Sequence, residues 1–245
     1  CMGLHSYTLL VRGESMGFQW VNYYRRKRDF VDLSYEIGRL IPEISSPETS
    51  RRKREDAIIR LGNISTLDDL APEVIDLVEQ AVDPIIRILN DEEEHISTRK
   101  YASSSLVKIG NDQAFIGLFR ALCIKDAKSR TFFDNDVAWC LAKFKDESYV
   151  GFLISQLQSY RNRSNILLKI RVIRSLAWPG NLRAFGPVAH AIHDESKRVR
   201  WEAAYALGQM DDERAIVPLS VALRDEDPRF RLQVAKALAR FRGQV

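Results

Sequence analysis

The feature that most constrains the fold of this chain is a leucine that recurs in a fixed local context. Residues 199–208 and 230–239 share one pattern of basic, small and apolar residues, and their leucines, Leu207 and Leu238, are 31 residues apart. Further steps of 31, 35, 35 and 45 residues towards the N-terminus complete a set of six anchor leucines: Leu61, Leu106, Leu141, Leu176, Leu207 and Leu238. A repeat of this length is one supersecondary unit, which buries its apolar face only by stacking on its neighbours.

Other positions keep the same register. Five of the six residues that stand seven before an anchor are basic, and the sixth is Asp134: the basic ones are Arg54, Arg99, Lys169, Arg200 and Arg231. A second apolar segment precedes each anchor segment from Leu106 onwards, with the markers Leu89, Leu122, Leu157, Ile192 and Leu223. Apolar residues three and four apart, such as Ile216, Leu219 and Leu223, indicate helices rather than strands. The repeat unit is therefore a pair of helices.

These patterns predict an all-α fold, a right-handed α-α superhelix of about six helix pairs. Residues 46–245 would form the repeats. Residues 1–45 have no anchor but keep helical apolar spacing, so we expect an N-terminal helical cap of the same domain. Pro42–Ser50 is rich in Pro, Ser and Glu and is predicted to be a loop. The long step between the first two anchors contains Leu67–Val82, which is expected to extend or add a helix.

Two segments, Asp194–Gly208 and Asp225–Leu238, resemble HEAT repeats of the kind found in phycobilisome lyases. The resemblance extends over about residues 50–245. It implies a HEAT-like solenoid in which the second helix of each pair lines the concave face. It also implies that Asp194 and Asp225 pair with the basic residue of the next helix. The resemblance is specific for the fold and unspecific for the function.

The basic column has two interpretations. A ladder of cations along the stack could bind the phosphates of a nucleic acid. Alternatively, the cations could form an internal ladder of ion pairs with the acidic turns, because a buried charge is normally paired. We favour the internal ladder.

Residues six and two before each anchor are one helical turn apart and should face outward together. At three successive anchors these pairs are Asn135 with Trp139, Ile170 with Arg174, and Trp201 with Tyr205. Exposed Trp, Tyr and Arg side chains are typical of partner-binding surfaces. The predicted contact stripe is Asn135, Trp139, Arg174, Trp201 and Tyr205. The open alternative is that these rings only pack between neighbouring repeats.

Two acidic residues, Asp134 and Asp136, form a candidate ligand pocket, because Asp134 replaces the basic residue of its column. Capping of the helix start is the competing role for Asp134. Residues 138–144, with the sequence Ala-Trp-Cys-Leu-Ala-Lys-Phe, resemble an aromatic helix in one subunit of the E/F-type bilin lyases. Cys140 stands where that family has a second Trp. The resemblance implies a bilin ligand whose pyrrole nitrogens pair with Asp134 or Asp136 and whose tetrapyrrole is covered by Trp139 and Tyr205.

Motifs for catalysis are weak. His190 and His193 are three residues apart, but a metal site needs more ligands, so no metal is expected. We find no glycine-rich phosphate loop and no nucleophile motif. Cys123 and Cys140 lie on apolar helix faces and are expected to be inert core residues. Whether the chain is an enzyme stays open, with a preference for a non-catalytic role, and no cofactor is expected unless a bilin binds.

The charge balance allows a third function class. The net charge is +4 and the isoelectric point is about 9.0. Basic runs at Arg25–Arg28, Arg51–Arg54, and Arg161 with Arg163 would suit nucleic acid, but 33 acidic residues are mixed among them. No apolar run is long enough for a membrane helix. Three unpaired cysteines favour a reducing compartment, and we predict the cytoplasm.

A protein-binding scaffold or adaptor is therefore the leading functional hypothesis. Its partner would dock on the concave face of the stack. A bilin lyase or bilin-handling chaperone is the first alternative. Nucleic-acid binding is the second and is less favoured.

Overall fold

The computed structural model describes residues 32–123, 132–159, 166–178 and 180–241, with only the backbone described at 132–135. These residues form helices joined by turns, and no strand occurs among them. Residues 32–45 are helical. The helices that follow are α2 (Arg51–Ile64), α3 (Pro72–Glu79), α4 (Val82–Asn90), α5 (Ile96–Ile109), α6 (Asp112–Cys123) and α7 (Phe132–Leu141). The C-terminal half contains α8 (Glu147–Ser159), α9 (Ile166–Leu176), α10 (Leu182–Ala191), α11 (Lys197–Gln209), the 3₁₀ turn η2 (Glu213–Ala215), α12 (Ile216–Ala222) and α13 (Pro228–Ala239).

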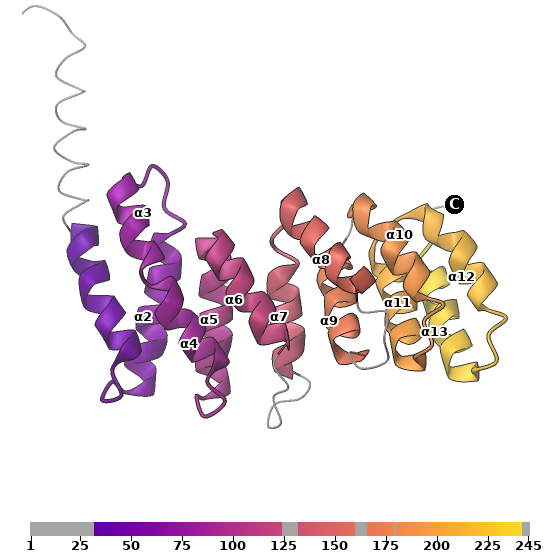
Figure 1. The fold of residues 1–245 in the computed structure, drawn as a ribbon, viewed down its shortest axis with the longest axis horizontal. Helices are drawn as coiled ribbons and strands as arrows, with labels where there is room; N and C mark the ends of the chain where they lie inside the picture. The colour runs from indigo at the N-terminus through magenta and orange to yellow at the C-terminus, as the bar shows by residue number, and fades with distance from the viewer. Residues whose placement is uncertain (1–31, 124–131, 160–165, 179, 242–245) are drawn as a thin grey trace, which may run out of the picture.

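The helices stack in pairs along the long axis of the molecule (Figure 1). The second helices of the pairs, α2, α5, α7, α9, α11 and α13, each contact the next one in the series. The first helices α4, α6, α8, α10 and α12 pack against the second helices of their own pairs. We call the surface formed by the second helices the inner face. The all-α, HEAT-like solenoid predicted from the repeat is confirmed.

The anchor leucines form the spine of the core. Five of the six, from Leu61 to Leu207, have no exposed surface, and Leu238 is partly buried. Each lies in a second helix, where it faces the first helix of its own pair and the neighbouring pair. The marker Leu223 differs from its counterparts, since it is 39% exposed. Within the described residues no further pair follows α13, so nothing covers this side of α12.

The N-terminal helix joins the same core. Ile37, Leu40 and Ile44 are buried in one cluster with the residues of α2, so residues 32–45 occupy the place of a first helix beside it (Figure 1). Residues 1–31 of the predicted cap lie outside the described residues. The loop predicted at Pro42–Ser50 begins later, at Ser46, because Ile44 has its place in the core and keeps residues 42–45 helical. The stretch predicted to add a helix contains α3.

The turns between first and second helices are bound together by the basic column. Lys169 of α9 lies 2.6 Å from the carboxylate of Asp194, in the turn before α11. Arg200 of α11 lies 3.3 Å from the carboxylate of Asp225, in the turn before α13. Arg200 also donates to the backbone oxygen of Asp194 in its own turn. Lys169 therefore joins its own helix to the turn of the next repeat. Arg200 joins the turn of its own repeat to the turn of the next one.

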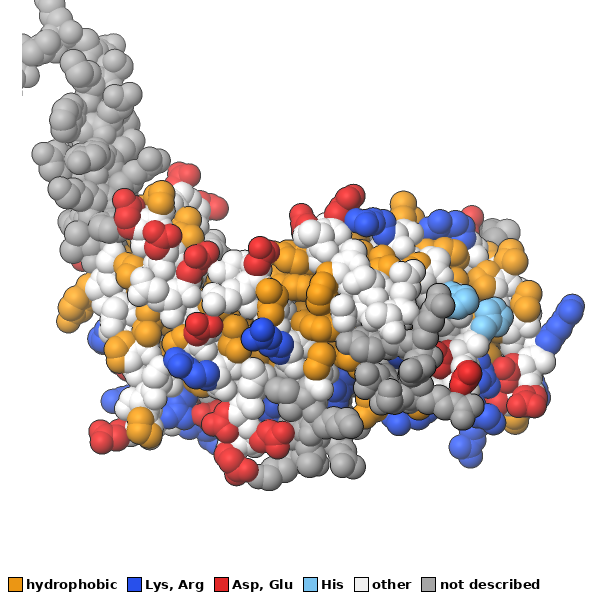
Figure 2. All heavy atoms as spheres, in the orientation of Figure 1, with side chains coloured by type: hydrophobic (Ala, Val, Ile, Leu, Met, Phe, Trp, Pro, Cys, Tyr) orange, Lys and Arg blue, Asp and Glu red, His pale blue; other side chains and the backbone are white. Residues whose placement is uncertain are grey.

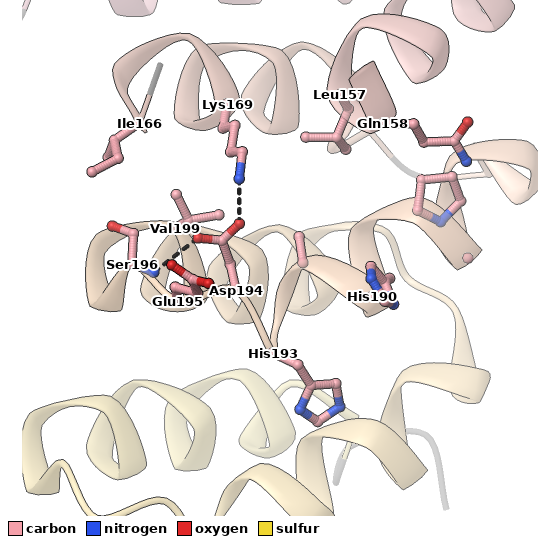
Figure 3. A pocket seen from close by; sticks show the side chains of 13 residues that line it. Leu157, Gln158, Ile166, Lys169, His190, His193, Asp194, Glu195, Ser196 and Val199 are labelled. Carbon is pink, nitrogen blue, oxygen red and sulfur yellow. Dashed lines mark hydrogen bonds and ion pairs between the residues drawn. The ribbon is translucent and has the colours of Figure 1, made fainter. Parts of the chain in front are cut away.

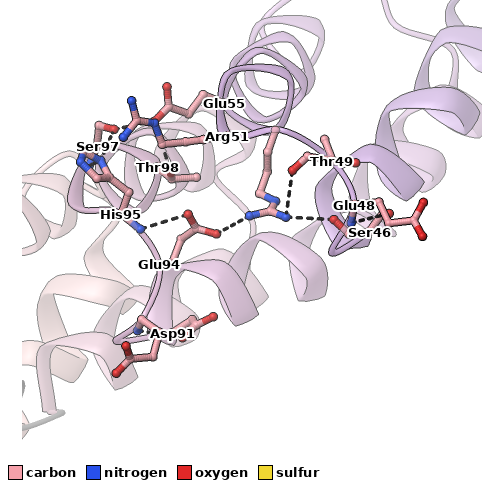
Figure 4. A network of polar contacts seen from close by, with 12 residues as sticks. Ser46, Glu48, Thr49, Arg51, Glu55, Asp91, Glu94, His95, Ser97 and Thr98 are labelled. Carbon is pink, nitrogen blue, oxygen red and sulfur yellow. Dashed lines mark hydrogen bonds and ion pairs between the residues drawn. The ribbon is translucent and has the colours of Figure 1, made fainter.

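The N-terminal end repeats this arrangement. Arg54 of α2 lies 2.6 Å from Glu94, in the turn before α5, and donates to the backbone oxygens of Ser46 and Thr49 in its own turn (Figure 4). The internal ladder is thus present. One detail of the expectation was wrong, because the carboxylates of Asp194 and Asp225 bind the basic residue of the preceding repeat, while the next helix binds the backbone oxygens of the turn.

The aromatic residues in the middle of the chain pack between first helices. Phe115 of α6 contacts Phe144, Tyr149 and Phe152 with ring centroids 4.5–5.7 Å apart. Figure 2 shows hydrophobic side chains gathered over α6 and α8 on this side of the molecule. These contacts join the α6–α7 pair to the α8–α9 pair, and they lie away from the inner face.

Candidate partner-binding groove

An open groove of about 1200 Å³ runs along the inner face in the C-terminal half. It is formed by α7, α9 and α11, by the turns that follow them, and by Arg240 at the C-terminal end of α13. Its lining residues are Trp139, Ala142, Lys143, Lys145, Arg174, Ala177, Trp178, Trp201, Glu202, Tyr205, Gly208, Gln209, Asp211 and Arg240. Aromatic and charged side chains therefore dominate the groove, and the small residues among them keep it open.

Four of the five residues of the predicted contact stripe line this groove: Trp139, Arg174, Trp201 and Tyr205. They come from three successive second helices, as the column spacing requires. The backbone of Asn135 lies in α7, one turn before Trp139, but its side chain lies outside the described part of the chain. The role of the stripe in binding a partner stays a prediction.

The rings of the groove are open to solvent. Trp139 is 62% exposed, Trp201 41% and Tyr205 42%. Trp201 and Tyr205 stack with centroids 6.1 Å apart and planes at 10°, as residues one turn apart on a helix can. Packing between repeats would bury such rings, whereas here two fifths or more of each residue is exposed. The stack gives a flat aromatic platform on α11.

The floor of the groove contains a fixed ion pair. Arg174 of α9 donates from Nε and Nη2 to the two carboxylate oxygens of Glu202 of α11, at 2.8 and 2.7 Å. The Glu202 side chain is only 4% exposed, whereas that of Arg174 is 36% exposed. A bidentate pair of this kind fixes the guanidinium plane. It therefore holds Arg174 in position between the rings of α7 and α11.

Two lysines lie against tryptophan rings at one side of the groove. Lys143 Nζ is 4.1 Å from the ring centroid of Trp139, and Lys145 Nζ is 5.1 Å from that of Trp178. These cation–π contacts leave the ammonium groups exposed, because the ring occupies only one side of each. A ligand with both apolar and anionic groups could contact ring and cation together.

The sequence reasoning missed part of the groove. Lys143, Trp178, Gln209 and Arg240 each stand two residues after an anchor leucine and line the groove. They extend the stripe by one more turn, since the positions six before, two before and two after the anchor are spaced by four residues. Reading this third column would have found them.

Of the predicted acidic pocket, the described side chain, Asp136, does not line the groove. Asp136 Oδ2 lies 2.8 Å from Lys100 Nζ of α5, and Asp136 is absent from the groove lining. This ion pair joins α5 to α7. The side chain of Asp134 lies outside the described residues, and its backbone is in the first turn of α7.

The two described cysteines differ. Cys140 is buried in α7, and burial raises the pKa of its thiol to about 11, which keeps it protonated near neutral pH. Cys123, at the end of α6, was expected in the core, but it is exposed because α6 ends there. Burial of part of its surface still raises the pKa of Cys123, partly opposed by Arg171.

A second cavity, of about 970 Å³, lies beside α9 and α10 and is lined by His190, His193, Lys169 and Asp194 among others (Figure 3). His190 lies in the last turn of α10, whereas His193 follows the end of that helix, so the two rings do not share a helix face. Lys169 and Asp194 are occupied by their ion pair. No group of three metal-ligating side chains occurs in the described parts of the chain.

None of the described helices is both long enough and apolar enough to span a bilayer. Of the basic runs considered for nucleic acid, Arg25–Arg28, Arg161 and Arg163 lie outside the described residues. Arg54 is engaged by Glu94 and the adjacent turn.

Comparison with known proteins agrees with the repeat. A family model of HEAT repeats matches residues 155–239, which contain the C-terminal end of α8 and all of α9 to α13. No curated protein matches the sequence.

Several solved structures of helical repeat proteins are similar to this chain. The complex of CpcE and CpcF of phycocyanin lyase from Nostoc is 22% identical, with a TM-score of 0.42, over 81% of this chain and 74% of that chain. A designed armadillo repeat protein in complex with the peptide (KR)4 is 16% identical, with a TM-score of 0.39, over 83% of this chain and 98% of that one. Human deoxyhypusine hydroxylase is 19% identical, with a TM-score of 0.33, over 86% of each chain. These likenesses extend to the fold alone.

Proposed function

We propose that this protein is a scaffold or adaptor that docks a partner protein in the inner-face groove of its C-terminal half. One observation carries the proposal. Exposed Trp, Tyr and Arg side chains from three successive repeats line a single open groove instead of packing inside the protein. Such side chains supply most of the binding energy at protein interfaces, because they bury a large area with little loss of conformational freedom.

The groove also has features that suit a protein segment. Glu202 and Arg174 are held by each other, so the partner meets a fixed surface and little ordering is needed on binding. The rings of Trp201 and Tyr205 provide apolar area at its centre. Charged residues at its edges, Lys143 and Arg240 among them, can select a partner of complementary charge.

We do not extend the proposal to bilin handling. That alternative relies on Asp134 and Asp136 beside Trp139, and Asp136 is paired with Lys100 outside the groove. Nucleic-acid binding is kept as an outcome of the experiments below.

The proposal is tested by affinity capture from native lysate with three matched proteins. These are the wild type, the groove variant Trp201→Ala with Tyr205→Ala, and the control Val217→Ala with Val221→Ala, which removes exposed side chains of α12. All three should have the same helical circular dichroism. We expect a protein that is retained by the wild type and the control and lost from the groove variant. Equal capture by all three would overturn the proposal.

A further inference from the structure

We infer that the occupant of the groove is an acidic segment of the partner, bound in an extended conformation across α7, α9, α11 and α13; the inference rests on the proposed function. The charges in the groove favour such an occupant. Four cations line it, Lys143, Lys145, Arg174 and Arg240, against two carboxylates, Glu202 and Asp211. Glu202 is largely buried and taken by Arg174.

Three of the four cations have no carboxylate within ion-pair distance among the described residues. The ammonium groups of Lys143 and Lys145 lie over tryptophan rings, and Arg240 forms no ion pair with a described residue. On α5, by contrast, Lys100 of the inner face is paired with Asp136. Exposed cations held in fixed places beside rings attract carboxylates, and they repel a basic segment.

The dimensions of the groove suit an extended peptide. Packed helices lie about 8–10 Å apart, so the three steps from α7 to α13 span roughly 25–30 Å. An extended chain advances about 3.3 Å per residue, so about eight residues cross the groove. Lys143 and Lys145 lie at the α7 end and Arg240 at the α13 end, with the Trp201–Tyr205 platform between them. The matching segment therefore has acidic residues towards both ends and apolar side chains in its middle.

A peptide fits these charges better than a nucleic acid does. A strand of this length would place a phosphate beside every nucleotide, and the centre of the groove offers the Arg174–Glu202 pair, whose charges compensate each other. Asp211 adds a negative charge to the lining near the turn after α11. Separate carboxylates at the two ends, rather than a continuous line of phosphates, match the distribution of unpaired cations.

The test uses two synthetic peptides with a fluorescent label, each about ten residues long to exceed the span of the groove. One has glutamates at both ends and leucine and alanine in the middle. The other has lysines in place of the glutamates. We expect saturable binding of the acidic peptide by fluorescence anisotropy, with an affinity that falls as salt screens the charges, and no saturable binding of the lysine peptide.

Two variants with matched charge changes assign the site. Lys143→Glu with Lys145→Glu should weaken the acidic peptide at least about tenfold, because attraction becomes repulsion at one end. Arg224→Glu with Arg229→Glu, which changes two exposed arginines outside the groove, should leave the affinity within about twofold. Thermal unfolding of both variants should match that of the wild type.

Three results would overturn the inference. These are no binding of the acidic peptide, equal loss in the two charge variants, or displacement of the peptide by a single-stranded oligonucleotide that binds more tightly. If the acidic peptide does not bind, the proposed function still stands provided that affinity capture finds a partner and that Trp201→Ala with Tyr205→Ala abolishes its capture. If that double variant changes no capture either, both proposals fail.

Discussion

The two ends of the inner face are built from the same stacked helix pairs, but their surfaces differ. The N-terminal end has polar side chains that are bound to their neighbours, whereas the C-terminal half has exposed aromatic rings. In α2 and α5, the stripe positions six before the anchors are bound to neighbouring residues: Glu55 accepts hydrogen bonds from Ser97 and Thr98, and Lys100 pairs with Asp136. In α7 and α11, the stripe positions include Trp139, Trp201 and Tyr205, which remain exposed. The stacked helices therefore provide the surface. The side chains at two or three repeat positions determine whether that surface is occupied by contacts within the protein or is open to a partner.

The buried core should contribute equally to the stability of both halves, and we expect core substitutions to have the largest effects on the free energy of unfolding. Leu106→Ala in α5 and Leu207→Ala in α11 each remove a side chain with no exposed surface and leave a cavity. Each should lower the free energy of unfolding by about 2–5 kcal/mol, measured by urea titration. A cost below about 1 kcal/mol in one half would mean that this half relaxes around the cavity and that the two cores differ.

The ion ladder should also be common to both halves. Lys169→Met and Arg54→Met each remove the cation and leave the carboxylate of Asp194 or Glu94 in a largely buried turn. We expect each to lower the free energy of unfolding by about 2 kcal/mol, since an unpaired charge stays behind. Arg183→Met is the matched control, because its pair with Glu147 is exposed, and it should cost less than about 0.5 kcal/mol. Equal values for all three would show that the ladder contributes no more than a surface pair.

The sequence predicted the ladder and the stack because both follow from one repeat period. Leu61 and Leu207 are far apart in sequence but are both fully buried, and five of the six residues seven before an anchor are basic. The expectation for Cys123 was wrong, since this residue is exposed where α6 ends. Leu223 is exposed because no described pair follows α13.

The groove was predictable in part. Trp139, Arg174, Trp201 and Tyr205 could be placed on one face from spacing alone. That Arg174 is held by Glu202 could not, because the pair joins α9 to α11 and depends on how closely the two helices approach. The acidic residue at Asp134, in a column that is otherwise basic, led to the prediction of a ligand pocket in α7. The pairing of Asp136 with Lys100 could not be predicted in this way, because it depends on the distance between α7 and α5.

Breaking the polar end of the inner face should have a moderate effect on stability. Glu55→Ala removes the acceptor for the hydroxyls of Ser97 and Thr98, and Thr98 is fully buried. The free energy of unfolding should fall by about 1–2 kcal/mol, because a buried donor is left without a partner. The matched change Ser104→Ala, at an exposed position of α5, should cost less than about 0.5 kcal/mol. A negligible cost for Glu55→Ala would remove the distinction between the two ends.

The smallest effect on stability is expected at the aromatic end. Trp139 is 62% exposed, and its ring contacts the ammonium group of Lys143, which is itself exposed. Trp139→Ser should therefore change the free energy of unfolding by less than about 0.5 kcal/mol. The same change should weaken the acidic peptide severalfold, because it removes the ring that holds Lys143 beside the groove. If Trp139→Ser instead lowers the free energy of unfolding more than Glu55→Ala does in urea titration, the ring stabilises the α7 pair. The aromatic end of the inner face would then be occupied by contacts within the protein, as the polar end is.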